Sequence, residues 1–381
     1  MNREIESSLG TNAMITSSQV LVRNSNRTIQ KGFKKTARNM TNLPEMDVTP
    51  TPNRAWNSGV FKVIKVVVNS CSTTDRRRNP PCEGKTQHVR LVTIGPSHYC
   101  EKARWVLDIL DNDPHSPIYH TENAHPPFLQ SLETLPLSNG SVSMVPMVEY
   151  TKSNGQQEII HDSQKIVEHF LPHLYPASCK SDILELEDYF GRHIGATARC
   201  YLYHVMLKPK YYPMLIILLT AQASSVEKLI YGKILEKGVA KGMKKAMEIN
   251  DDSAEASLVA LRNSFHDVSL KLEKEDGSKK KFIMDTDTEE FGFTAADLAF
   301  CSMASAIICP PELALFVPMK DEEMPPELLD LRNELRNTLA GQHVLDVYRN
   351  LRGQVIPKVV NRDSVPTGNI CTDVNNVLSR L

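Results

Sequence analysis

A serine that follows a glycine-proline pair is the first residue of this chain whose surroundings suggest chemistry. Residues Arg90–Ile94 predict a short strand, Gly95 and Pro96 interrupt it, and a helical pattern begins after Ser97. Serine is a favoured cap at the start of a helix, where its hydroxyl lies beside unpaired backbone N–H groups. Because these groups and the helix dipole carry partial positive charge, Ser97 is a candidate for binding or stabilising an anion.

A second polar pair opens another predicted helix. Asp162 and Ser163 precede the apolar residues Ile166, Val167 and Phe170, which are spaced as on one face of a helix. A serine hydroxyl and free N–H groups at a helix start suit a carboxylate, whereas a nearby carboxylate suits an amino group. An ordinary helix cap explains the same two residues, and both roles can hold at once.

These polar residues need strands and helices to position them, and the sequence predicts both. Strands are predicted over Arg90–Ile94, Ile118–His120, Met144–Tyr150 and Gln157–Ile160. An Asn-Gly pair between the last two is the strongest short-range hairpin signal. Helices are predicted after the first, second and fourth strands. The helix after the second strand is short, over Phe128–Leu132. From Ser181 onward the apolar residues recur at helical spacing, first in one long helix over Ser181–Leu207, and Lys274–Phe291 is predicted to be a charged loop too polar for the core. A β-α-β-α-β-β-α domain therefore precedes an all-helical one.

Several segments in a consistent order resemble glutathione transferases. Residues Ser97–Arg104 (SHYCEKAR) resemble the active-site loop and first helix of that family in its serine-type arrangement. Residues Phe293–Phe300 (FTAADLAF) predict a capping box and resemble the start of a buried helix in the family's helical domain. Leu186–Tyr189 and Gly341–Tyr348 resemble two further segments. The resemblance implies an α/β thioredoxin-like domain followed by an all-α helical-bundle domain, the glutathione transferase-like fold.

The resemblance also implies a catalytic residue and a glutathione site. Ser97 would be catalytic and stabilise the glutathione thiolate, and Asp162 with Ser163 would hold the γ-glutamyl end of the peptide. Val145-Pro146 would form a cis peptide bond that turns the Val145 backbone groups toward the ligand.

Two neighbours of the serine, His98 and Tyr99, are expected to line the same glutathione cleft. His125 and Gln130 could reach the glycyl carboxylate, but the sequence gives no reason to assign either residue that role.

The energy that such a site must supply is within reach of one hydroxyl and one helix start. A free thiol has a pKa near 8.5, and lowering it by about two units corresponds to roughly 2.7 kcal/mol. A hydrogen bond to a charged group contributes roughly 1.5–3 kcal/mol. A helix N-terminus adds about 0.3–1 kcal/mol. Ser97 could therefore shift the thiol pKa without a metal, and no metal is expected.

The expected function is conjugation of the glutathione thiolate to a hydrophobic, electrophilic small molecule. One alternative is a binding or scaffold protein that uses the same fold without catalysis. Another is a glutathione-dependent thiol-disulfide reductase that uses Cys100, which lies near the same helix start. Because Cys100 shares an apolar stripe with Ala103 and Leu107, it is interpreted as a structural residue.

Composition limits the other possibilities. The net charge of −1 gives no sign of nucleic-acid binding. Eight cysteines without a CxxC pair indicate neither a zinc site nor a disulfide framework, so a reducing compartment is expected. The longest apolar run, at Met214–Leu219, is too short to span a membrane. The resemblance leaves a homodimer open.

Four segments are predicted along the chain. Residues 1–87 form an N-terminal extension, 88–172 the thioredoxin-like glutathione-binding domain, 179–355 the helical domain and 356–381 a polar tail. The extension is rich in Ser, Thr, Asn and basic residues up to Asn42, which suits either a disordered segment or an organelle address. A strand-like piece, Val60–Val68, lies within it. The expected location is the cytoplasm, with a plastid or mitochondrion as the alternative.

Overall fold

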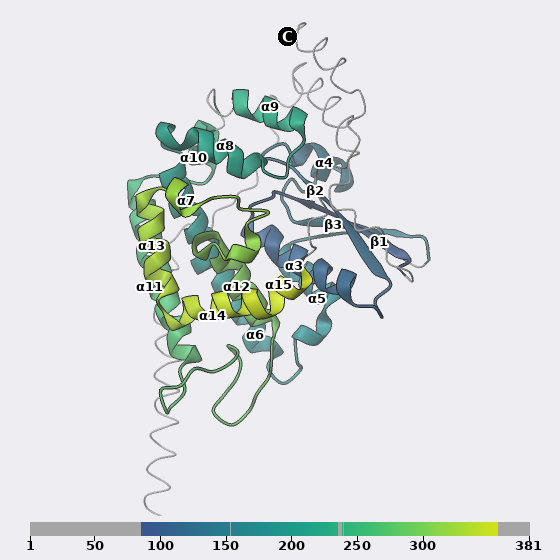
Figure 1. Cartoon of the computed structure of the whole chain (residues 1–381). Helices are drawn as coiled ribbons and strands as arrows, with labels where there is room; N and C mark the ends of the chain where they lie inside the picture. Colours follow the sequence, from purple (N-terminus) through teal and green to yellow (C-terminus); the bar gives the residue numbers. More distant parts are fainter. Residues whose placement is uncertain (1–84, 153, 235–237, 239, 357–381) are drawn as a thin grey trace, which may run out of the picture. The chain divides into compact units, whose positions relative to one another are not determined.

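The computed structural model describes residues 85–152, 154–234, 238 and 240–356 (Figure 1). The predicted N-terminal extension and polar tail, apart from their innermost residues, lie outside these ranges, as does the strand-like Val60–Val68. Among the described residues, no helix combines the length and the apolar character needed to cross a membrane.

The first part of the described chain is a four-stranded mixed sheet with helices between its strands. The strands lie in the order β2-β1-β3-β4, with β1 parallel to β2 and antiparallel to β3. Apolar residues of β1, β3, α3 and α5 form a common core on one face of the sheet. The bounds are β1 Gln87–Thr93, α3 His98–Asn112, β2 Ile118–Ala124, α4 Ser131–Leu137, β3 Met147–Thr151, β4 Gln157–His161 and α5 Ser163–Phe170.

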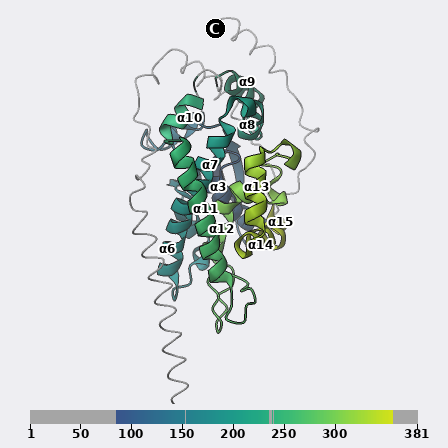
Figure 2. The same cartoon turned by 90° about the vertical axis from the view of Figure 1, so that its left-hand side faces the viewer.

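The second part is entirely helical. Helix α12 is buried on almost every side and packs against α3, α6 and α14, which is the behaviour of a helix that is apolar all round. Helix α11 runs alongside α7 (Figure 2). The main helices are α6 Lys180–Phe190, α7 Ala196–Met206, α8 Tyr212–Thr220, α9 Ser225–Ile234, α10 Ala240–Ala246, α11 Asp251–Leu272, α12 Ala295–Ile308, α13 Pro326–Arg336, α14 Leu339–Val347 and α15 Gly353–Val355.

Short helical segments join these elements. Two are π-helical, η3 Gly191–Gly195 and η8 Tyr348–Arg352. Four are single 3₁₀ turns: η2 Pro172–Leu174, η4 Pro209–Tyr211, η6 Pro311–Leu313 and η7 Asp321–Glu323.

The order of elements confirms the predicted fold, a thioredoxin-like α/β domain followed by an all-helical domain as in glutathione transferases. The predicted capping box is also present, because Asp297 Oδ2 accepts hydrogen bonds from both the backbone N–H and the hydroxyl of Thr294. Phe293, which precedes the box, lies with its ring 5.7 Å from that of Trp105 in α3.

Three local predictions need correction. The single helix expected from Ser181 to Leu207 is divided by the π segment η3. The short helix expected at Phe128–Leu132 begins only at Ser131, because Phe128 has a φ of 72°, which a helix does not allow. The loop over Lys274–Phe291, expected to be too polar for the core, buries part of itself. The buried Asp285 accepts backbone hydrogen bonds from within and directly after the loop, and the N–H of Ile283 donates to Asp297 of α12 at 2.9 Å.

Candidate active site

The strand register brings the predicted site residues to the same end of the sheet, where β1 and β4 end and β3 begins. Val92 at the end of β1 pairs with Met147 at the start of β3, and Met147 pairs with His161 at the end of β4. The segments that hold Ser97, Val145-Pro146 and Asp162-Ser163 therefore leave the sheet side by side. The loop after β2 joins them, because the backbone N–H of His125 donates to Thr93 O at 2.9 Å.

Ser97 is the N-cap of α3. Its backbone is extended, its N–H donates to Ile94 O at 3.0 Å and its Oγ accepts a long hydrogen bond from Cys100 N at 3.4 Å. The residue is only half-buried. Because Oγ acts there as an acceptor, its proton remains available for donation to an anion.

The loop before Ser97 rests on a buried arginine. Arg104 donates to Gly95 O at 3.2 Å and forms ion pairs with Glu101 at 2.7 Å and with Glu122 at 2.6 Å. Its guanidinium also lies 4.0 Å from the centre of the Phe316 ring. Both carboxylates hold the pKa of Arg104 above its ordinary value despite its burial, so a permanent positive charge lies behind the loop.

His98 and Tyr99 point toward the helical domain. Tyr99 Oη donates to Gly191 O at 2.8 Å, and its ring packs against the backbone of Gly195. His98 is buried beside Tyr99, and burial, aided by the charge of Arg199, lowers its pKa to about 3, so the ring is neutral. Both side chains thus hold α3 against the η3 segment. Their predicted contact with glutathione stays a prediction.

The other predicted residues lie directly before β3 and at the start of α5. The Val145–Pro146 peptide bond is cis. Asp162 has a φ of 83° and its Oδ1 accepts from Gln164 N at 2.8 Å, so it caps α5. Ser163, the first residue of that helix, is 8% exposed.

Cys100 is unsuited to redox chemistry in this structure. Its side chain is fully buried and its Sγ accepts from Ile94 N at 3.5 Å. Burial raises the pKa of the thiol to about 11, although the Ser97 hydroxyl and Ile94 N–H oppose the shift. The residue is therefore a protonated, inaccessible thiol at neutral pH.

His125 is committed to two carboxylates. Its Nε2 lies 2.6 Å from Glu133 of α4 and its Nδ1 lies 2.5 Å from Glu227 of α9. These two partners raise the pKa of His125 to about 9 against the effect of burial, so it is an imidazolium at neutral pH. It therefore has no free ring nitrogen for a glycyl carboxylate. Gln130 donates to Ser143 O at 3.3 Å.

Two residues of the helical domain reach the site and were missed by sequence reasoning. Gln222 packs on Gly95, where an added Cβ would lie 3.1 Å from Gln222 Cγ, and its Nε2 donates to Leu315 O at 2.6 Å. Arg199 of α7 lies with its guanidinium 6.0 Å from the centre of the Tyr99 ring. Neither residue belongs to a sequence motif, so only the three-dimensional fold identifies them as neighbours of the site.

A cavity lies beside the Gln222 contact. Its volume is about 360 Å³, which falls within the range of small-molecule sites. Most of its lining is apolar, with one lysine and one threonine; the residues are Ile217, Thr220, Ala221, Lys228, Ala314, Leu315 and Pro318.

Comparisons with known proteins give structural matches alone. No protein-family model matches the sequence, and no curated protein matches it either. The chain is similar to FzlA from C. crescentus, with 12% identity, a TM-score of 0.43 and coverage of 72% of this chain and 94% of FzlA. Poplar glutathione transferase F1 matches with 13% identity, a TM-score of 0.36 and coverage of 69% and 98%. Ure2p in complex with glutathione matches with 13% identity, a TM-score of 0.35 and coverage of 68% and 93%.

Proposed function

We propose that this chain is a glutathione transferase that adds the glutathione thiolate to a hydrophobic, electrophilic small molecule. The observation that supports this most is the convergence of three segments at one edge of the sheet. The helix start at Ser97, the cis peptide at Val145-Pro146 and the helix start at Asp162-Ser163 are adjacent through the strand pairing. They offer, in that order, a hydroxyl, the half-buried backbone of Val145 before β3 and a second hydroxyl beside a carboxylate.

Each segment matches one part of glutathione. Asp162 and Ser163 would take the amino and carboxylate groups of the γ-glutamyl end, because both charges then meet an opposite partner or a donor. The backbone of Val145 would pair with the extended peptide. Ser97 would then meet the cysteinyl sulfur at the N-terminus of α3.

In this reaction Ser97 would favour the thiolate form of glutathione over its thiol form. Its hydroxyl would donate to the sulfur, and the first-turn N–H groups of α3 would add their partial positive charge. Arg104, which is itself paired with Glu101 and Glu122, donates to Gly95 O and so holds the loop before Ser97 in place. The thiolate then attacks the electrophilic carbon, a sulfur–carbon bond forms, and the leaving group departs or the adjacent carbon takes up a proton.

The electrophile would lie between the loop at Gly95 and the helical domain. Gln222, in the turn between α8 and α9, contacts this loop, and the largely apolar cavity beside it would take a hydrophobic body. Cys100, the cysteine next to Ser97 in the described part of the chain, supplies no redox-active thiol because it is buried and its raised pKa keeps it protonated.

The proposal is tested by titrating reduced glutathione into the full chain by calorimetry, followed by a conjugation assay with a chloronitrobenzene. Binding together with conjugation supports the transferase. Binding without conjugation of any of a panel of electrophiles favours the scaffold alternative, whereas reduction of a mixed disulfide by Ser97→Ala but not by Cys100→Ala would favour the reductase. If neither binding nor turnover is seen, the proposal is wrong.

A further inference from the structure

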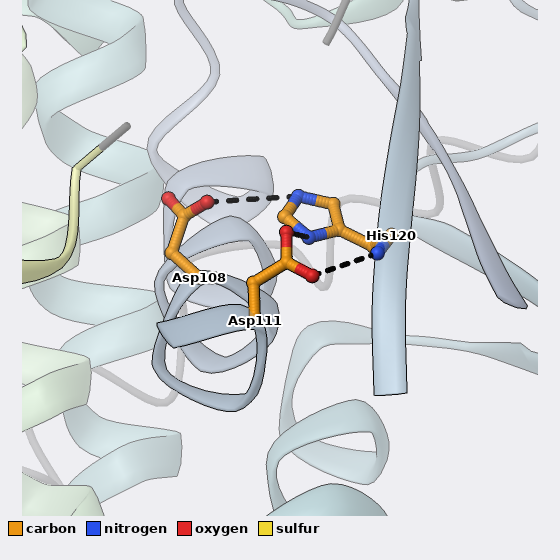
Figure 3. A group of neighbouring side chains, drawn as sticks. All are labelled: Asp108, Asp111 and His120. Carbon is orange, nitrogen blue, oxygen red and sulfur yellow. Dashed lines mark hydrogen bonds and ion pairs between the residues drawn. The ribbon is translucent and has the colours of Figure 1, made fainter. Parts of the chain in front are cut away.

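Two aspartates and a histidine meet on the far half of α3, away from the site described above. Asp108 and Asp111 lie on one side of the helix, and His120 projects toward them from β2 (Figure 3). The Asp111 carboxylate lies 2.9 Å from His120 Nδ1, and that of Asp108 lies 3.6 Å from Nε2. One ligand atom from each residue lies within 4.8 Å of the other two. His120 is 3% exposed and Asp108 is fully buried.

The histidine nitrogens are not satisfied by hydrogen bonds. A ring N–H needs its acceptor nearly in line with the bond. Neither ring nitrogen of His120 has such a partner among the described residues, although Asp111 Oδ2 is at hydrogen-bond distance from Nδ1. The carboxylate oxygen therefore lies beside the line of the N–H bond rather than on it.

A metal ion bound to His120 Nδ1 would lie on the line of that N–H bond, and Asp111 Oδ2, beside the line, is placed to be a second ligand of the same ion. Two adjacent ligands of an octahedral ion with bonds of about 2.1 Å lie about 3 Å apart. The 2.9 Å between Asp111 Oδ2 and His120 Nδ1 agrees with this spacing. The backbone N–H of His120 donates to the other Asp111 oxygen at 3.1 Å and so fixes the carboxylate in place.

The charge of the surroundings also favours a cation. The connected ion pairs hold four carboxylates and two guanidinium groups; the residues are Glu101, Asp108, Asp111, Glu122, Arg104 and Arg352. Excess charge in a buried cluster is costly unless it is paired. A cation bound by the two aspartates would add positive charge to a cluster in which carboxylates outnumber guanidinium groups.

We propose that Asp108, Asp111 and His120 bind one divalent transition-metal ion. Two carboxylates and one imidazole suit Zn²⁺, Mn²⁺ or Fe²⁺, and the imidazole disfavours Mg²⁺ and Ca²⁺. Arg352, whose Nη1 lies 2.8 Å from Asp108 Oδ2, would orient the carboxylate from outside the metal. No metal-ligand spacing is visible along the chain, because the two aspartates lie on α3 and the histidine on β2.

The ion would be structural. Asp108 is eleven residues beyond Ser97, roughly 16 Å along the helix, so it is remote from the proposed thiolate. It would join β2 to α3 and, through Arg352, to the η8 segment of the helical domain. Metal binding and glutathione binding are therefore expected to be independent, and failure of one proposal leaves the other untouched.

The test is calorimetric titration of Zn²⁺ and Mn²⁺ into the full chain after treatment with a chelator. We expect one ion per chain and a melting temperature that rises with the metal. Asp111→Asn, which keeps the shape of a partly accessible side chain, and His120→Gln should each weaken binding at least tenfold. The matched control is Asp113→Asn, which removes an exposed carboxylate two residues further along the chain and should bind as the parent does.

A second readout protects the test against a variant that fails to fold. Co²⁺ in place of Zn²⁺ should give a visible absorption spectrum that is lost or shifted in Asp111→Asn, and glutathione affinity should be the same with and without the ion. If the chelated parent chain takes up no stoichiometric ion, or if Asp111→Asn binds as tightly as the parent, the three side chains are a buried polar cluster without a metal and the proposal is overturned.

Discussion

At the scale of single residues, two side chains three positions apart show how much depends on environment. Ser97 caps α3 and is half-buried, whereas Cys100 lies fully buried within the first turn of the same helix. The thiol is the stronger nucleophile in water, yet burial raises its pKa to about 11. The hydroxyl needs no ionisation to donate a hydrogen bond. The weaker nucleophile is therefore the better placed of the two to assist an external thiol.

The same reasoning assigns a binding role to Ser163. Replacing it with alanine should raise the KM for glutathione about tenfold, the worth of one hydrogen bond to a charged group, with turnover nearly unchanged. The γ-glutamyl end is remote from the sulfur and is bound equally in the ground and transition states. Steady-state kinetics at varied glutathione concentration would show this split. An unchanged KM with a strongly reduced turnover number would contradict the binding role of Ser163.

Residues at helix starts could be predicted from the sequence, but contacts between residues far apart in the sequence could not. Ser97 and Asp162 precede apolar residues at helical spacing, which is a local signal. His125 and Glu227 are 102 residues apart, and their pairing depends on how α9 returns to the sheet. Gln222 reaches Gly95 in the same way. No local pattern encodes such contacts, so the sequence located the helix starts but left their partners unassigned.

At the scale of elements, the side chain of Tyr99 in α3 packs against the π-helical segment η3. The carbonyl of Gly191 accepts both the i+5 bond from Ala196 N and the Tyr99 hydroxyl. A Cβ added at Gly195 would lie 2.6 Å from Tyr99 Oη and 2.7 Å from Met303 Sδ. The absence of a side chain at this one position thus lets α3 approach the helical domain. Helical periodicity alone predicted one unbroken helix here, because a π segment changes the spacing by a single residue.

Gly195→Ala should therefore destabilise the chain by roughly 1–3 kcal/mol, the usual range for overpacking. Gly191→Ala is the matched control, because nothing lies within 4 Å of a Cβ added there. Denaturant unfolding of both variants gives the comparison. Equal stabilities would mean that the Tyr99 contact does not limit this interface.

The His125 bridge joins α4, α9 and the end of β2, and its stability should depend on pH. Its folded pKa of about 9 lies above the unfolded value of 6.5, so the bridge stabilises fully below 6.5 and is lost as pH rises through about 9. The loss is roughly 3 kcal/mol at most. Both partner carboxylates have lowered pKa values, so acid weakens the bridge only well below neutral pH.

The free energy of unfolding, measured between pH 7 and pH 10, checks this prediction. The parent chain should lose stability across the interval, and His125→Gln, although less stable overall, should show a flatter dependence. Parallel curves for the two proteins would show that His125 is not charged in the folded state.

At the scale of the whole molecule, the two domains share one core. Trp105 of α3 packs against Phe293 and Tyr348 of the helical domain, and Arg352 pairs with Glu101 of α3 at 2.6 Å. Periodicity predicted the order of elements, with strands and helices alternating in the first half and helices alone in the second, and the family resemblance implied the fold class. The buried ion pairs between the halves had no such signal.

The described sheet and its helices are complete from Lys85 onward, so the preceding residues should be dispensable for folding. A chain that begins at Lys85 should be soluble, melt cooperatively near the temperature of the full chain and bind glutathione with the same affinity. Lys85 should be kept, because its Nζ donates to Leu110 O at 2.8 Å and to Asp113 O at 2.7 Å at the end of α3. An aggregated product would mean that the upstream segment belongs to the fold.

The central claim is that Ser97 stabilises a thiolate on bound glutathione, and the pKa of that thiol tests it most directly. The ultraviolet absorbance of the thiolate can be titrated on the complex with the parent chain, with Ser97→Ala and with Cys100→Ala. We predict a pKa roughly two units below the free value of about 8.5 for the parent and for Cys100→Ala, and a return toward 8.5 for Ser97→Ala. An unshifted thiol in the parent complex, or a lowered pKa that survives in Ser97→Ala, would contradict the account.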